Sequence, residues 1–231
     1  MKIFATIKWA GATFIIFLSL ALMIVFFPFL KKRGPKVAAS FIQILTRFKV
    51  KTIGSEDPEA TMFILNHQSD LDIAVMELAS KKELAWVAKK ELFEIPFFGL
   101  ALKLPEDIAV DREDKRSLIK LLKDADDRLK KGKTITIFPE GTRGRGKKML
   151  PFKSGAKLIA DKYRLKVQPV VLIETAKYYN IKKMHYEAGE IKVIYLESFY
   201  AERGNSEWLK DIRKTMQEVY DNELANNLSN R

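Results

Sequence analysis

The first thirty residues contain the feature that most limits what this chain can fold into. Residues 9–30 (WAGATFIIFLSLALMIVFFPFL) form a run of 22 without a charged side chain. A helix of that length reaches roughly 33 Å, enough to cross the ~30 Å hydrocarbon core of a bilayer. A signal peptide fits less well, because its apolar region usually has about 7–15 residues and a small-residue cleavage site follows it. Here Lys31, Lys32 and Arg33 follow instead. A buried soluble helix fits poorly too, since the run is apolar on every face.

A second helix is expected over residues 35–50. Pro35 suits a helix start, and Val37, Phe41 and Ile44 recur on one side at helical spacing. Such an amphipathic helix either lies at a membrane interface or packs on the soluble core. Residues 1–53 are therefore predicted to be a membrane-associating helical segment, which either spans the bilayer or dips into one leaflet. If the first helix spans, the basic residues after it place the rest of the chain on the cytoplasmic side of the cell membrane.

Residues 54–231 have the pattern of an α/β catalytic domain. Short apolar runs alternate with longer helical stretches, which predicts a mixed, largely parallel central sheet flanked by helices. The expected strands are 61–65, 85–88, 108–110, 134–138, 167–173 and 191–195. The expected helices are 71–80, a proline-interrupted stretch near 92–104, 113–131, 154–163 and 207–224.

Composition narrows the chemistry. The chain has no cysteine, which excludes a disulfide, a thiolate nucleophile and a cysteine-type zinc site. Its two histidines, His67 and His185, are too few for a three-histidine metal site. Lysine and arginine number 41 against 29 acidic residues, a net charge of +12. Such a chain attracts anions, which include nucleic acid, anionic lipid and phosphorylated substrates.

The motif NHQSDLD (residues 66–72) offers a general base. His67 falls between an expected strand and an expected helix, and Asp72 lies five residues later. The Asp72 carboxylate can reach back to one imidazole nitrogen, fix the tautomer and stabilise the imidazolium after proton uptake. A helix-capping cluster with Ser69 or Asp70 as N-cap is an open alternative. Asp70 and Asp72 as a metal-binding pair is a weaker one.

The motif FPEGTRGRG (residues 138–146) offers an anion site. Its glycines allow close backbone approach, and its arginines present planar forks suited to phosphate oxygens. Lys153 follows at the start of an expected helix, whose N-terminus also favours anions. A solvated basic loop is the alternative. Glu140 would accept a hydrogen bond from a substrate hydroxyl or hold an arginine in place. Arg112 is either a further phosphate contact or part of a surface salt bridge.

Aromatic residues gather around Pro96 and Gly99 between these two motifs. They would line an apolar channel or belong to the core. The candidates for the channel are Phe93, Phe97 and Phe98.

Together these motifs resemble the glycerophospholipid acyltransferases. NHQSDLD is similar to the His-x4-Asp motif of that family, and FPEGTRGRG to its Phe-Pro-Glu-Gly-Thr-Arg motif. KKELFEIPFFG and VDR lie between them in matching order, and a strand with Pro169 follows, so the resemblance covers residues 61–173. Chain length and the apolar N-terminal run point to the bacterial 1-acylglycerol-3-phosphate acyltransferases. One departure is Gly144, where many members have serine.

The resemblance implies a function and a set of site residues. His67, oriented by Asp72, would deprotonate the free sn-2 hydroxyl of 1-acylglycerol-3-phosphate (lysophosphatidic acid), which then takes an acyl group to give phosphatidic acid in phospholipid biosynthesis. Acyl-CoA or acyl carrier protein would be the co-substrate, with no cofactor, no metal and no nucleic acid partner, and the lipid bilayer would be a partner. The phosphate and glycerol contacts would be Arg112, Glu140, Gly141, Thr142, Arg143 and Lys153. Alternatives are acylation of glycerol-3-phosphate or another lysolipid, or a non-catalytic membrane-tethered anion-binding protein.

Overall fold

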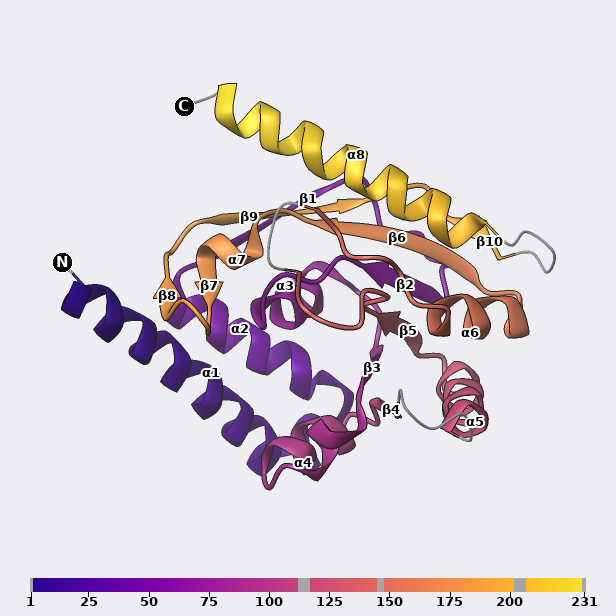
Figure 1. The fold of residues 1–231 in the computed structure, drawn as a ribbon. Coiled ribbons are helices and arrows are strands. Elements are labelled where there is room, and N and C mark those ends of the chain that lie inside the picture. Colours follow the sequence, from indigo (N-terminus) through magenta and orange to yellow (C-terminus); the bar gives the residue numbers. More distant parts are fainter. Residues whose placement is uncertain (1, 112–116, 145–147, 202–206, 230–231) are drawn as a thin grey trace.

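The chain begins with a helical hairpin (Figure 1). The computed structural model describes residues 2–111, 117–144, 148–201 and 207–229. Helix α1 spans Lys2–Leu30, the short 3-10 helix η1 spans Lys31–Arg33, and α2 spans Gly34–Thr46. The stretch Ile3–Thr46 is long and apolar enough to cross a membrane by length and composition, and 11% of its most apolar window is buried. The long apolar helix expected over residues 9–30 is confirmed.

The second helix is shorter than predicted over residues 35–50. Arg47 adopts a left-handed backbone with φ 58°, which ends α2 after Thr46. Lys49–Ile53 then form strand β1, which pairs in parallel with strand β9 (Glu190–Tyr195). The β-branched residues of the sequence KVKTI favour an extended backbone over a continued helix. Residues 49–53, which we expected to end the helical segment, therefore belong to the sheet.

Within the described residues, eight strands form one mixed sheet in the order β1-β9-β6-β2-β5-β3-β4, with β10 paired to β6. The pairs β1–β9, β6–β2, β2–β5, β5–β3 and β3–β4 are parallel, whereas β6–β9 and β6–β10 are antiparallel. The remaining strands are β2 (Met62–Leu65), β3 (Leu84–Lys89), β4 (Ile108–Val110), β5 (Thr134–Ile137), β6 (Lys166–Leu172) and β10 (Phe199–Tyr200). The prediction of a mixed, largely parallel sheet flanked by helices is confirmed.

Helices cover both faces of the sheet (Figure 1). Helix α3 (Leu71–Ala79) packs on one face together with α1 and α2. Helices α5 (Ser117–Lys130), α6 (Gly155–Tyr163) and α8 (Trp208–Ser229) cover the other face. Strand β2 shows the consequence, because Phe63 and Leu65 join the core on the α3 side while Met62 and Ile64 join the opposite core. A strand buried on both faces reads as a continuous apolar run, as this one does.

The stretch expected as a helix near residues 92–104 divides at Pro96. The 3-10 helix η2 covers Lys90–Glu94, and α4 begins only at Phe98 and ends at Lys103. A residue before proline disfavours helical geometry, and Phe97 follows with a positive φ of 60°. A further short helix, α7 (Thr175–Tyr178), precedes a hairpin of strands β7 (Tyr179–Asn180) and β8 (His185–Tyr186).

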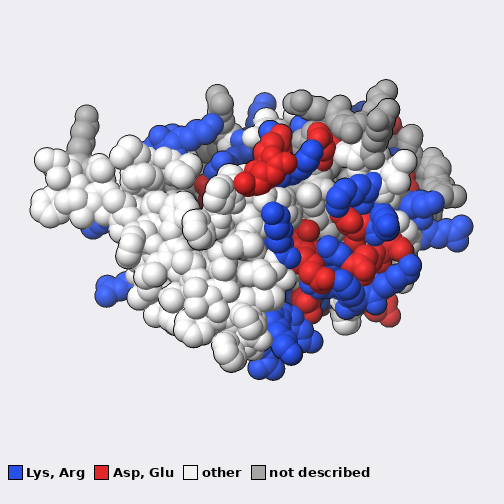
Figure 2. All heavy atoms as spheres, turned by 90° about the horizontal axis from the view of Figure 1, so that it is seen from below, with Lys and Arg blue, Asp and Glu red and all other residues white. Residues whose placement is uncertain are grey.

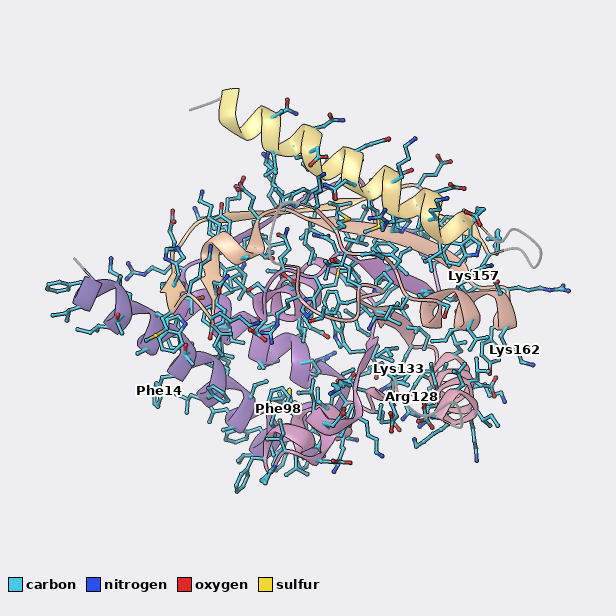
Figure 3. The ribbon with its side chains drawn as sticks, viewed as in Figure 1. Phe14, Phe98, Arg128, Lys133, Lys157 and Lys162 are labelled. Atoms are coloured by element: carbon cyan, nitrogen blue, oxygen red, sulfur yellow. The ribbon has the colours of Figure 1, made fainter. Side chains whose placement is uncertain are left out.

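One side of the molecule is apolar over a broad area. Figure 2, seen from the α1 side, shows a region where the described residues present no charged side chain, bordered by charged side chains of both signs. Phe14 on α1 points outward there (Figure 3) and is 66% exposed. We call the exposed apolar side chains of α1 and of the segment 95–100 the apolar face. Its large members are Ile3, Phe4, Ile7, Phe14, Phe17, Leu18, Leu22, Val25, Phe26, Phe29, Ile95, Phe97 and Leu100.

Candidate active site

The sheet topology brings the two sequence motifs together. Strands β6, β2 and β5 are parallel neighbours, so the loops after Leu172, Leu65 and Ile137 leave the same edge of the sheet. In α/β sheets, ligands bind outside the carboxyl ends of the strands. The loop with His67 follows β2, and the loop with Arg143 follows β5. A third loop, which follows β6 and leads into α7, meets them there.

Asn66 fixes the start of the histidine loop. Its side-chain Oδ1 accepts the Leu172 N–H at 2.7 Å, and its Nδ2 donates to the Leu172 carbonyl oxygen at 2.9 Å. The buried amide thus continues the ladder between β2 and β6 by one more step. His67 therefore leaves the sheet from a fixed point. The sequence pattern did not identify this role of Asn66.

His67 and Asp72 form the expected pair. The His67 Nδ1 lies 2.8 Å from the Asp72 Oδ2, and the Asp72 side chain is fully buried. The same oxygen accepts the backbone N–H groups of Gln68 at 2.7 Å and Ser69 at 3.0 Å. An ionised carboxylate can only accept, so Nδ1 carries the proton and Nε2 is left as an acceptor. Asp70 at the N-cap makes no side-chain cap hydrogen bond, whereas the Ser69 hydroxyl accepts the Leu71 N–H at 3.2 Å, so Ser69 helps to start α3 beside the pair.

Aromatic stacking fixes the plane of the imidazole. The His67 ring lies 3.9 Å from the Phe138 ring at an angle of 12°, and Phe138 stacks in turn on Trp86 at 5.2 Å. Phe138 is the first residue of the second motif. Stacked rings of this kind contribute about 0.5–1.5 kcal/mol beyond burial. The His67 side chain keeps 17% of its surface exposed, so one edge of the ring remains accessible.

Glu140 joins the two motif loops to each other. One carboxylate oxygen accepts the His67 N–H at 2.8 Å, and the other accepts the Leu150 N–H at 2.7 Å. The Gly144 N–H donates back to the His67 carbonyl oxygen at 2.7 Å. Burial raises the pKa of the Glu140 carboxyl, and the two backbone donors partly offset this effect. Glu140 therefore positions the histidine loop through its backbone, and in this structure its oxygens face protein amides.

Gly141 permits a tight turn next to Glu140. Its φ is +71°, and a Cβ atom there would lie 3.1 Å from the Cδ and Cε atoms of Lys153. The Lys153 side chain thus passes over the turn and stays exposed, as does Thr142.

An open pocket of about 580 Å³ lies where the loops after β2, β5 and β6 meet. Arg143 lines this pocket and forms an ion pair with Asp70 across it. Glu140, Gly141, Thr142 and Lys153 do not line it, and Arg112 lies outside the described residues. The lining residues are Gln68, Ser69, Asp70, Arg143, Gly144, Glu174, Ala176, Lys177, Tyr179, Asn180, Ile181, Lys182, Lys183 and Tyr220.

A second, apolar cavity of about 160 Å³ lies between α1, α2, α3 and α4. Phe98 lines it, from the start of α4 (Figure 3). The other two channel candidates do not line it: Phe93 is buried beneath Gly99, and Phe97 is 80% exposed on the apolar face. Asp70 lines both the cavity and the larger pocket, so the two spaces lie next to each other at the start of α3.

The carboxylates of this region are committed to protein donors. Asp72 accepts a hydrogen bond from His67, and Asp70 forms an ion pair with Arg143. Among the residues that the structure describes, no group of three or more His, Cys, Asp or Glu is placed to hold a metal ion. Tyr220 on α8 contacts the histidine loop, because its hydroxyl accepts a hydrogen bond from the Gln68 side-chain amide at 2.8 Å. No sequence signal linked Gln68 to a residue 152 positions away.

The fold is that of an α/β acyltransferase. The chain belongs to the acyltransferase family, whose model matches residues 49–173. It is 41% identical over 211 residues to the 1-acyl-sn-glycerol-3-phosphate acyltransferase of Helicobacter pylori, covering 89% of each chain. It is 31% identical to the Escherichia coli enzyme of the same name, covering 66% of each chain.

A solved structure supports the fold independently. The crystal structure of PlsC, the 1-acyl-sn-glycerophosphate acyltransferase of Thermotoga maritima, superposes with a TM-score of 0.75 at 24% identity. The match covers all of this chain and 98% of that one. The architecture seen here, with its N-terminal helices, is thus that of a known structure.

Proposed function

We propose that the protein transfers a fatty acyl group from a thioester to the free sn-2 hydroxyl of 1-acylglycerol-3-phosphate, giving phosphatidic acid for phospholipid biosynthesis. Acyl-CoA or acyl carrier protein is the donor. The names of the curated relatives support the reaction, and the observation that carries the chemistry is the His67–Asp72 pair, which does not itself line the open pocket but whose loop neighbours Gln68 and Ser69 do.

The proposed mechanism is a direct transfer. The free His67 Nε2 takes the proton of the acceptor hydroxyl as its oxygen attacks the thioester carbonyl. The new C–O bond replaces the C–S bond, and the leaving thiolate receives the proton that His67 holds. Asp72 keeps the ring oriented and stabilises the imidazolium in between. Phe138 and Glu140 support this geometry, since one packs against the ring and the other holds the loop backbone.

Arg143 is the proposed contact for the acceptor phosphate. It lines the pocket from the loop after β5, and its guanidinium can exchange the Asp70 carboxylate for a phosphate. Arg112 and Lys153 remain proposed phosphate contacts, and Gly141 and Thr142 proposed glycerol contacts. Glu140 is proposed to act on the substrate site by positioning the loop.

The apolar cavity is the proposed place for an acyl chain. It lies beside Asp70, and Phe98 and the two N-terminal helices form part of its wall. An acyl chain there avoids water, at roughly 0.8 kcal/mol for each buried methylene. The apolar face lies on the same helices, so lipid can reach the cavity from a bilayer. We propose that the protein sits in the cell membrane with its sheet on the cytoplasmic side, where Lys31–Arg33 meet anionic headgroups.

The test uses the two histidines of the chain as a matched pair. The protein is purified in neutral detergent, and thiol release from acyl-CoA is followed with a panel of acceptors, among them lysophosphatidic acid and glycerol-3-phosphate. His67→Ala is expected to lower kcat by about 10²–10⁴-fold, the usual contribution of a general base. His185→Ala removes a 44% exposed imidazole on β8 and should leave kcat within about twofold of wild type.

Two results would contradict the proposal. A folded His67→Ala protein with wild-type kcat would refute the base assignment. A folded wild-type protein that releases no thiol with any acceptor would refute the enzymatic function and leave the anion-binding alternative.

A further inference from the structure

The hairpin after β6 gives the pocket beside His67 a second set of cations. Lys177 lies on α7, and Lys182 and Lys183 lie in the turn between β7 and β8. All three line the same pocket as Arg143. The family model ends at residue 173, so these lysines lie beyond the part of the chain that it matches.

The hairpin is held in a fixed place. The Ser69 hydroxyl, two residues from His67, donates to the Tyr179 carbonyl oxygen at 2.6 Å. The Tyr179 hydroxyl lies 3.0 Å from the Thr13 hydroxyl on α1, and the Tyr186 hydroxyl donates to the Thr46 carbonyl oxygen at the end of α2. The hairpin is thus fastened both to the catalytic loop and to the two N-terminal helices. Its lysines are therefore presented at a defined position beside the base.

The charges around the pocket favour an anion. Its lining contains four cations (Arg143, Lys177, Lys182, Lys183) and two carboxylates (Asp70, Glu174), a formal excess of 4 − 2 = +2. Arg143 already pairs with Asp70. Among the described residues, none of the three lysines has a carboxylate within ion-pair distance; the Lys177 ammonium lies 5.2 Å over the Tyr178 ring. The lysines are therefore the cations of this pocket that a ligand can engage without first breaking an ion pair.

We propose that Lys177, Lys182 and Lys183 bind a phosphate group of a substrate in this pocket, which Arg143 also lines. The inference rests on the proposed function, because both substrates of that reaction carry phosphate. The acceptor has a phosphomonoester, and a CoA donor has a diphosphate and a ribose phosphate. The pocket volume of about 580 Å³ lies within the range of about 300–1,000 Å³ that is usual for small-molecule sites.

The experiment measures equilibrium binding, so that it does not depend on turnover. The double variant Lys182→Ala/Lys183→Ala removes two exposed side chains. The control Lys210→Ala/Lys214→Ala removes the same charge from α8, where both side chains are nearly 80% exposed and outside the pocket. Binding of CoA and of lysophosphatidic acid is measured in neutral detergent micelles, with pantetheine and monoacylglycerol as the phosphate-free partners. Neutral micelles remove any attraction to an anionic bilayer.

The expected result is a Kd for CoA, for lysophosphatidic acid or for both that is about three- to tenfold higher in the hairpin variant than in the control. The phosphate-free ligands should bind all variants equally, Lys177→Ala should have the same direction of effect, and Lys182→Arg/Lys183→Arg should restore binding. The ligand whose Kd rises, CoA or lysophosphatidic acid, identifies the substrate whose phosphate the lysines bind. Equal Kd values for both phosphorylated ligands in the hairpin and control variants would overturn the proposal, and would leave the His67 mechanism untouched.

Discussion

A buried carboxyl on α3 allows the electrostatics of the interior to be tested quantitatively. Glu77 is 8% exposed, and it accepts the Trp86 indole N–H at 2.8 Å. It also lines the apolar cavity. Burial raises the pKa of Glu77 from 4.5 to about 7, although the Trp86 hydrogen bond and the Lys36 charge act in the opposite direction.

This shift makes the free energy of unfolding depend on pH. The unfolded chain loses the Glu77 proton near pH 4.5 and the folded chain only near pH 7, so the folded state binds the proton more tightly. The stabilising effect of protonation is therefore fully present below about pH 4.5 and is lost as the pH rises through 7. At roughly 1.36 kcal/mol per pH unit, the interval from 4.5 to 7 corresponds to about 3 kcal/mol.

Glu77→Gln keeps an oxygen for the Trp86 N–H and removes the titration. The variant should be slightly more stable than wild type at pH 5 and clearly more stable at pH 8, and the difference should grow by about 2.5 kcal/mol between these values. Urea unfolding in neutral detergent, followed by tryptophan fluorescence at several pH values, measures it. Burial also raises the pKa of the neighbouring Asp107, and the Glu77 charge adds to this effect, so the comparison measures Glu77 together with its influence on Asp107.

Glu94→Gln is the matched control, because Glu94 is exposed on η2 and its neutralisation should leave the pH profile of wild type unchanged. The reasoning would be refuted if Glu77→Gln and wild type had parallel stability profiles from pH 5 to pH 8. Such a result would mean that water reaches the carboxylate in the folded state.

Two further predictions follow from the loops and the cavity. The glutamine of Glu140→Gln has one side-chain oxygen, so it accepts only one of the two backbone N–H groups that Glu140 binds. The substitution should cost about 1.5–3 kcal/mol of unfolding free energy and lower kcat. Unchanged values of both, measured by urea unfolding and thiol release, would contradict the positioning role. Ala101→Phe fills part of the apolar cavity and should shift the donor preference to shorter acyl chains in a chain-length series. Phe97→Ala, outside the cavity, should leave that preference unchanged; an equal response of the two variants would place the acyl chain elsewhere.

The parts of the site that lie on single loops could be predicted from the sequence. His67 and Asp72 are five residues apart, and a strand-to-helix turn of that length brings the carboxylate to the ring. The two motif loops could be placed at one edge because strands in an α/β sheet are mostly parallel. Their direct bonds could not be predicted, however. The Glu140 carboxylate could accept hydrogen bonds from many donors. The register of β2 on β5 decides that it accepts the His67 N–H.

The sequence could not predict the direction of a side chain where a single turn decides it. Phe97 and Phe98 are adjacent aromatic residues, yet one is 80% exposed and the other lines the cavity. The positive φ of Phe97, which follows Pro96, separates them. Arg47 has a similar effect, since its left-handed backbone ends α2 and residues 49–53 follow as a strand. Apolar periodicity does not report such single dihedral angles.

The N-terminal helices contribute to the position of His67, the proposed base. Ala12 on α1 and Ala39 on α2 belong to the same buried cluster as Leu71 and Val75 on α3, the helix that carries Asp72. Thr13 reaches Tyr179, whose carbonyl oxygen accepts the Ser69 hydroxyl next to the catalytic loop. Because packed side chains hold the His67 loop, His67 keeps a fixed distance from the apolar face. A flexible loop would not fix that distance. On the proposed function, this fixed distance sets the depth at which an acceptor hydroxyl must stand in the bilayer to be acylated.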